Sequence, residues 1–89
     1  MELKIHDLKL NIEFCEAVAS GEKSFEVREN DRGYQKGDLI SFQAVSKTGL
    51  LENHRINGML FKITYVLSGW GIKKGFVVFG IKEAIEAEI

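Results

Sequence analysis

The chain has 89 residues, of which 45% are hydrophobic and 28% charged, and its net charge is −1. These values predict one globular domain spanning residues 1–89, exclude a disordered chain, and argue against a protein that coats nucleic acid without sequence preference. The chain has a single cysteine and a charged N-terminus without a signal-peptide core, which predicts a cytoplasmic protein. It has no long apolar run, which predicts that it does not cross a membrane.

The first predicted strand covers residues 3–10, and a short helix follows it. Asn11 is its predicted N-cap, because an asparagine side chain can accept hydrogen bonds from the amides of the first turn. Gly21 is predicted to end this segment, because glycine adopts a positive φ without steric cost. Apolar residues between them recur at the spacing of one buried helix face: Ile12, Phe14, Cys15, Val18 and Ala19.

The next predicted strand, residues 24–29, alternates in character. Phe25 and Val27 point to one side and are expected to anchor the strand, because side chains alternate between the faces of a sheet. The polar side chains share the opposite face: Ser24, Glu26 and Arg28. Two polar turns, over residues 30–33 and 36–38, lead to the second half of the chain.

That second half predicts three more strands and a terminal helix. The strand over residues 39–45 has one apolar face, made of Ile40, Phe42 and Ala44. A polar loop, 46–58, precedes a strand over 59–67 in which alternate residues share a face: Met59, Phe61, Ile63, Tyr65 and Leu67. Residues 76–81 are apolar on both faces and predict a central strand. Residues 82–89 have the composition of a short C-terminal helix.

These elements predict an α+β or mainly β domain. Five short strands with one early helix lack the repeated crossover helices that a parallel α/β sheet needs. A small, partly closed mixed β-barrel, with one helix after its first strand and a short C-terminal helix, would remove most of the exposed strand edges.

The most informative segment for function surrounds the 24–29 strand. Glu26 and Arg28 lie on one face, with their Cα atoms about 7 Å apart, and Lys23 stands at the entrance of the strand. A carboxylate, a guanidinium and an ammonium in this arrangement can recognise a polar ligand, since Arg binds carboxylates or phosphates and Glu accepts from amino groups. The alternative is an ion-pair network on a solvated face.

The segment Gly21-Glu22-Lys23-Ser24-Phe25-Glu26-Val27-Arg28 matches the G-x-K-x-x-E-x-R signature of the ASCH domains, a branch of the PUA-like barrels. Four segments before, across and after this motif also match in order, so that about residues 3–82 resemble a small bacterial and phage subfamily of uncharacterised ASCH-like proteins. They are His6-Asp7-Leu8-Lys9, Phe25-Glu26-Val27-Arg28-Glu29-Asn30-Asp31-Arg32, Gln35-Lys36-Gly37-Asp38 and Gly75-Phe76-Val77-Val78-Phe79-Gly80-Ile81.

The resemblance implies a β-barrel with a cleft beside the first helix, lined by Lys23, Glu26 and Arg28. It also implies binding of RNA or of a modified nucleotide. Some small ASCH-like proteins resemble amidohydrolases that remove the acetyl group of N4-acetylcytidine with a Lys and a Thr of this strand. Lys23 matches that Lys, whereas Glu26 stands at the Thr position, so that Ser24 would be the remaining hydroxyl candidate.

Other side chains are candidates for ligand contacts. Trp70 lies between two glycines and either stacks on a base or forms a lid over one end of the barrel. His6 is either a ligand contact or a structural histidine bonded to a carboxylate or the backbone. Lys9 and Arg32 can contribute positive charge near the cleft. The spacing of the two histidines and the single cysteine predicts neither a metal site nor another cofactor.

Three functions are compatible with this pattern. The first is a binding module for RNA or a nucleotide-like ligand, recognising one unpaired base in the cleft. The second is an enzyme, an amidohydrolase or nuclease, with Lys23, Ser24 and Glu26 as candidate catalytic residues. The third is a protein-interaction domain, for which a broad apolar patch outside the cleft would be the signal.

Overall fold

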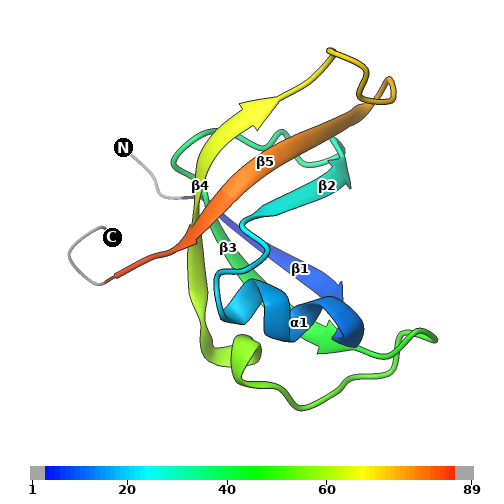
Figure 1. The fold of residues 1–89 in the computed structure, drawn as a ribbon, viewed down its shortest axis with the longest axis vertical. Coiled ribbons are helices and arrows are strands. Elements are labelled where there is room, and N and C mark those ends of the chain that lie inside the picture. Colours follow the sequence, from blue (N-terminus) through cyan, green and yellow to red (C-terminus); the bar gives the residue numbers. More distant parts are fainter. Residues whose placement is uncertain (1–3, 86–89) are drawn as a thin grey trace.

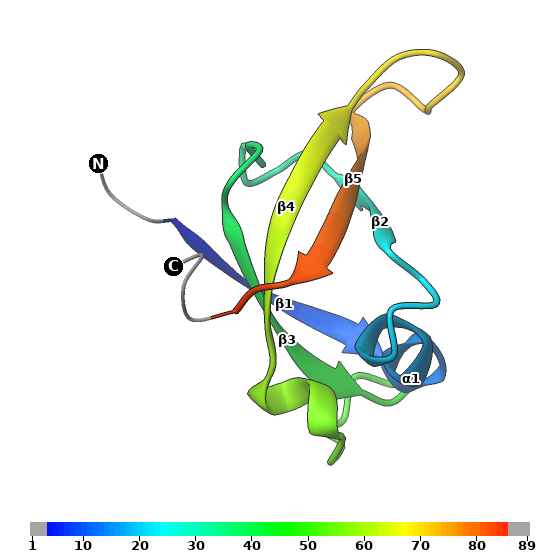
Figure 2. The same ribbon diagram turned by 60° about the vertical axis from the view of Figure 1, so that its left-hand side comes forward.

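The computed structural model describes residues 4–85, and its five strands form one mixed sheet in the order β1-β3-β4-β5-β2 (Figure 1). β1 and β3 are parallel, and every other neighbouring pair is antiparallel. Figures 1 and 2 show that the sheet curls strongly into a half-barrel. The strands are β1 (Ile5–Asn11), β2 (Phe25–Glu29), β3 (Leu39–Val45), β4 (Leu60–Leu67) and β5 (Phe76–Glu83), and the helix is α1 (Ile12–Ala19).

The ends of α1 agree with the prediction. Asn11 caps the helix, and its side-chain oxygen accepts a hydrogen bond from the Glu13 amide at 3.0 Å. Gly21 follows the helix with a φ of 86°, which favours glycine over residues that carry a Cβ. The predicted buried face is correct only in part: Cys15 and Val18 are buried. Ile12 and Phe14 are 36% and 42% exposed, which leaves the Phe14 ring accessible.

The core lies on the concave side of the sheet. The predicted apolar face of β3 is confirmed, since Ile40, Phe42 and Ala44 are all buried. β5 lies between β4 and β2, which confirms its central position. The β5 residues that enter the core are Val77, Phe79 and Ile81.

The predicted face of β4 is wrong beyond its midpoint. Phe61 and Ile63 are buried, but Tyr65 is 63% and Leu67 37% exposed. The pairing of β4 with β5 shifts register between Ile63 and Tyr65, so Thr64 is an inserted bulge residue. One extra residue moves every following side chain to the opposite face.

The 46–58 segment is not entirely a polar loop. Its last residues form a 3-10 turn, η1 (Arg55–Gly58), in which Ile56 is completely buried. The Arg55 guanidinium lies 2.8 Å and the His54 ring 3.2 Å from the Glu16 carboxylate of α1. Hydrogen bonding to Arg55 lowers the pKa of Glu16. The segment is thus held to the core and to the helix.

The predicted C-terminal helix is wrong at its start. Lys82 and Glu83 continue β5, paired with Lys62 and Phe61 of β4. The Ala84 amide still donates to the Leu60 carbonyl at 2.8 Å. β4 therefore offers backbone partners that a helix beginning at Lys82 would lose. The remainder of that prediction, over 86–89, lies outside the described residues.

Candidate ligand-binding cleft

The faces of β2 are reversed with respect to the prediction. Glu26 is only 3% exposed, whereas Phe25 and Val27 are 46% and 54% exposed. Glu26 pairs with Phe79, a core residue, and residues directly opposite in a sheet share one face. The register with β5 therefore turns the charged side chains of β2 toward the concave side. They do not form the solvated face that the sequence also allowed.

Glu26 is held by two cations. Its Oε1 atom accepts hydrogen bonds from Arg28 Nε at 3.0 Å and Nη2 at 2.8 Å. Its Oε2 atom accepts from Lys23 Nζ, which also donates to the Phe25 carbonyl at 2.9 Å. An ionised carboxylate has about four acceptor sites, so these bonds occupy most of the capacity of Glu26.

Arg28 links the two edges of the sheet. β1 and β2 stand at opposite ends of the strand order, and Arg28 Nη2 donates to the Lys9 carbonyl of β1 at 2.9 Å. A side chain thus supplies a contact across the mouth of the half-barrel, where strand pairing is missing. It also satisfies a carbonyl on an edge strand, where unpaired backbone groups are a liability.

A cleft of about 440 Å³ opens at this junction, a volume within the range of small-molecule sites. The Phe14 and Phe25 rings flank Lys23 Nζ, with centroids at 5.4 and 4.8 Å. Within residues 4–85, the Nη1 group of Arg28 makes no hydrogen bond. The cleft therefore offers N–H donors beside aromatic faces. Its lining comprises Lys9, Leu10, Asn11, Phe14, Lys23, Phe25, Glu26, Val27 and Arg28.

Two other predicted contacts lie at or next to this cleft. Lys9 lines it directly. Arg32 lines a second hollow, which shares Lys9 and Arg28 with the cleft and also contains the carboxylates of Asp7, Glu29 and Asp31. The surface beyond Arg28 thus has mixed charge, whereas the lining of the cleft has three cations and one carboxylate.

His6 and Ser24 do not line the cleft. His6 is buried, with Nε2 2.8 Å from Asp38 Oδ2 and its ring centroid 4.7 Å from that of Tyr34. This geometry corresponds to the structural histidine among the two predicted alternatives. Ser24 lines a different hollow, and its carbonyl accepts from the Ile81 amide at 3.0 Å.

Cys15 lies in the core, as predicted. Burial raises the pKa of its thiol, and the negative charge of Glu26 raises it further. The thiol contacts the Leu10 and Asn11 carbonyl oxygens at 3.6 and 3.4 Å. A neutral, buried thiol of this kind acts as a small apolar residue and not as a nucleophile.

Trp70 belongs to the turn between β4 and β5. This turn extends beyond the rest of the sheet (Figures 1 and 2). The residue is 91% exposed, so the predicted lid packed over the barrel is wrong. Its φ of 54° lies in the left-handed region, which is unfavourable for a bulky side chain. Trp70 is also absent from the lining of the cleft.

Trp70→Gly is expected to change the free energy of unfolding by less than about 1 kcal/mol, because glycine adopts a positive φ without strain. Trp70→Ala should be the less stable of the two by about 1 kcal/mol, because alanine retains the Cβ. Urea unfolding followed by far-ultraviolet circular dichroism measures both. A loss above about 2 kcal/mol in Trp70→Gly would show that the indole packs against the fold.

Sequence reasoning missed three contributors to this region. The sequence predicts Phe14 in the core, yet the residue lines the cleft. It indicates Lys9 for its charge, whereas the Lys9 carbonyl accepts the Arg28 bond. It assigns Asp38 to a turn, although Asp38 is also the partner of His6. The position of Phe14 at the margin of the apolar helix face is the one signal in the sequence that its ring could be exposed. The Arg28–Lys9 and His6–Asp38 contacts depend on strand pairing and leave no such signal.

The fold and the cleft define a small, mainly β domain with a half-barrel whose mouth has a basic, aromatic-lined cleft. The chain belongs to the DUF3850 family, a domain of unknown function whose model matches residues 5–81. It is also 34% identical over 71 residues to an uncharacterised 12.9 kDa protein in the GpA 3′ region of Escherichia phage P2. That alignment covers 79% of this chain and 62% of the phage protein, so the chain spans less than two thirds of its relative. None of the helices described for residues 4–85 is long and apolar enough to cross a membrane.

Proposed function

We propose that this domain binds a nucleotide, or one unpaired base of an RNA, in the cleft at the mouth of the half-barrel. The observation that carries the proposal is the position of Arg28. Its guanidinium is fixed by Glu26 and by the Lys9 carbonyl, while Nη1 has no partner within residues 4–85. A preorganised donor of this type suits the acceptor oxygens of a phosphate or a base.

The aromatic rim supports a base as part of the ligand. Phe14 and Phe25 are 42% and 46% exposed, and unpaired bases stack on such rings. Because Lys23 and Arg28 occupy most acceptor sites of Glu26, a base carbonyl or phosphate facing the cations fits better than an amino group facing the carboxylate. The charges of Lys23, Arg28 and Glu26 sum to +1, which also favours an anionic ligand.

Placement among the ASCH-like domains is part of this proposal. The motif strand borders the mouth of a curled mixed sheet, and one helix follows the first strand, as the resemblance implies. The hydrolase alternative lacks a comparable supporting observation. Lys23 donates to Glu26 and to a carbonyl, and Ser24 lines another hollow.

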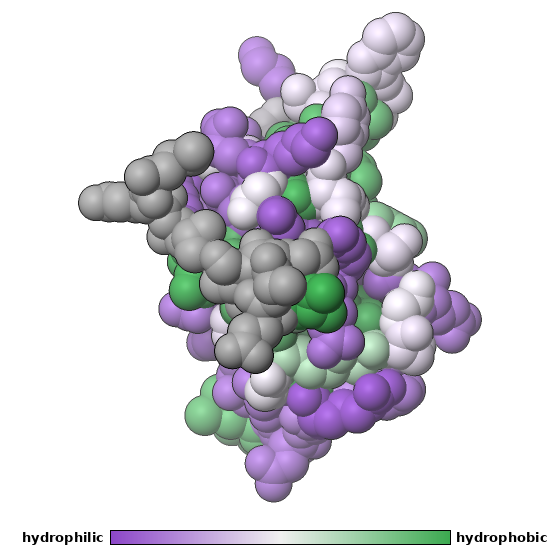
Figure 3. Space-filling model, turned by 90° about the vertical axis from the view of Figure 1, so that its left-hand side faces the viewer, coloured by the Kyte–Doolittle hydropathy of each residue, from purple (hydrophilic) through white to green (hydrophobic). Residues whose placement is uncertain are grey.

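The face drawn in Figure 3 bears on the protein-partner alternative. Outside the grey atoms, hydrophobic side chains form separate patches among hydrophilic ones on this face. Apolar protein interfaces are built on larger continuous patches. This face therefore gives the protein-interaction alternative no specific support.

Titration with uridine 5′-monophosphate, followed by amide NMR shifts, tests the proposal. We expect saturable shifts at the cleft, and Arg28→Lys should weaken binding by about tenfold or more, because lysine keeps the charge but loses the planar donor pair. Arg55→Lys, which changes an exposed arginine bound to Glu16, is the matched control and should bind like the unaltered protein. Equal binding by both variants would overturn the proposal, as would turnover of added N4-acetylcytidine, which would establish a hydrolase.

A further inference from the structure

A second feature lies on the convex side of the sheet, away from the core. Tyr65 of β4 and Phe25 of β2 both pair with Gly80 of β5, so the three residues form one row across the sheet and face outward. Because neighbouring strands lie about 4.8 Å apart, the two aromatic residues stand roughly 10 Å apart, with glycine between them. We call the surface formed by this row and by Lys36, Lys62 and Lys82 the outer face.

Thr64 fills the gap that Gly80 leaves. A Cβ atom at position 80 would collide with Thr64 Oγ1, so the hydroxyl occupies the position of the missing side chain. Thr64 reaches this position because it is the bulge residue between Ile63 and Tyr65, and bulges commonly redirect a side chain. The row thus combines exposed aromatic rings with a hydroxyl group between them.

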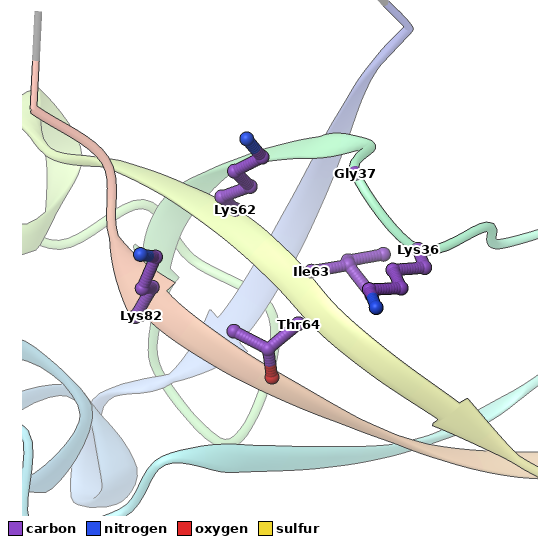
Figure 4. A pocket seen from close by; sticks show the side chains of 6 residues that line it. All are labelled: Lys36, Gly37, Lys62, Ile63, Thr64 and Lys82. Atoms are coloured by element: carbon purple, nitrogen blue, oxygen red, sulfur yellow. The ribbon is translucent and has the colours of Figure 1, made fainter. Parts of the chain in front are cut away.

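Lysines lie beside this row. Lys62 and Lys82 are direct cross-strand partners, so two cationic side chains share one face of the sheet. With Lys36, from the turn before β3, and Thr64 they line a hollow of about 540 Å³ (Figure 4). Among the described residues this lining contains three lysines and no carboxylate, although the whole chain has a net charge of −1.

We propose that the outer face binds single-stranded RNA, with a phosphate in the lysine hollow and a base stacked on Tyr65. Tyr65 is 63% exposed, and stacking on aromatic residues beside basic groups is the usual way of holding a single strand. Paired bases would not be accessible to such rings. A second copy using the same face would bring two lysine clusters together, so charge complementarity favours a polyanion.

This surface goes beyond the proposed function of the cleft. Neither Tyr65 nor any of the three lysines lines the cleft. Phe25 belongs to both surfaces, so substitutions at Tyr65 and at the lysines, and not at Phe25, separate the outer face from the cleft. A mononucleotide needs the cleft alone, whereas a strand of several nucleotides can contact both surfaces.

Fluorescence anisotropy with a labelled ten-nucleotide oligouridylate tests the inference. Tyr65→Ala should weaken binding about tenfold, the loss expected for one stacked base, whereas Tyr65→Phe keeps the ring and should retain affinity. A Lys36→Ala/Lys62→Ala variant should lower the slope of log K against log salt by about 1.4, since each phosphate contact on a single strand contributes about 0.7. Lys47→Ala, at the opposite end of β3, is the matched control and should change neither quantity.

Two further ligands distinguish base stacking on Tyr65 from binding in the cleft. An abasic strand of equal length should bind Tyr65→Ala as well as it binds the unaltered protein, because it lacks a base to stack. Uridine 5′-monophosphate should still shift the cleft resonances in all outer-face variants. Unchanged oligouridylate binding in Tyr65→Ala and in the double lysine variant would overturn the inference, even if Arg28→Lys confirmed the cleft. Binding of polyglutamate without binding of oligouridylate would overturn it as well, in favour of an acidic protein.

Discussion

Glu26→Ala is expected to lower the free energy of unfolding by about 3–5 kcal/mol, the typical result of removing one partner from a buried ion pair. The carboxylate is 3% exposed and accepts from both Lys23 and Arg28. Without it, two cations at the mouth of the half-barrel repel each other and lose their common acceptor. Such a loss is a large part of the roughly 5–15 kcal/mol that stabilises a domain.

Chemical denaturation of the purified variants measures this effect. Glu29→Ala is the matched control, because Glu29 is an exposed glutamate on the same strand, and its removal should change stability by less than about 0.5 kcal/mol. Glu26→Gln keeps the size of the side chain and should lie between the two. Equal stability of Glu26→Ala and Glu29→Ala would show that the three-residue network does not hold the fold.

Asp38→Ala is expected to lower the free energy of unfolding by about 2 kcal/mol, the usual consequence of leaving a buried polar group without its hydrogen-bond partner. Asp38 Oδ2 lies 2.8 Å from Nε2 of the buried His6 and accepts from the Gln35 amide at 3.0 Å. Alanine leaves the buried His6 ring without this partner, whereas the exposed Gln35 amide can bond to water. The substitution also releases the turn that positions the first residues of β3.

Thermal and urea unfolding of Asp38→Ala and two companion variants measure this effect. Asp38→Asn retains an oxygen acceptor and should lose less than half as much stability as Asp38→Ala. Asp31→Ala changes an exposed aspartate in the preceding turn, whose carboxylate oxygen lies 4.0 Å from Arg32 Nε, and should be close to neutral. A destabilisation of Asp31→Ala as large as that of Asp38→Ala would mean that the histidine contact adds nothing specific.

The burial of Glu26 explains how the motif can serve both fold and ligand. Glu26 holds Lys23 and Arg28 in place, and the cations retain donors that face the cleft. Substitutions at Glu26 therefore change both the free energy of unfolding and the ligand affinity. Arg28→Lys keeps the positive charge, so its effect on ligand affinity is easier to interpret.

Much of the local structure could be predicted from the sequence. The Asn11 cap, the positive φ of Gly21 and the buried face of β3 all depend on residues within one turn or one strand. The central position of β5 followed from its apolar character on both faces. For the candidate cleft, the period of a strand relates Glu26 to Arg28, and Lys23 follows as the residue at the entrance of that strand.

The sequence by itself thus determined the five strands, the first helix, the class of a partly closed mixed sheet and the charged motif. Only the tertiary structure decided which face of β2 is buried, where β4 bulges and how β5 continues past Ile81. The physical reason is that strand register is set by partners far apart in the chain. Because side chains alternate along a strand, Glu26 and Phe25 point in opposite directions. Only the pairing with Phe79 and Gly80 decides which of the two points toward the core.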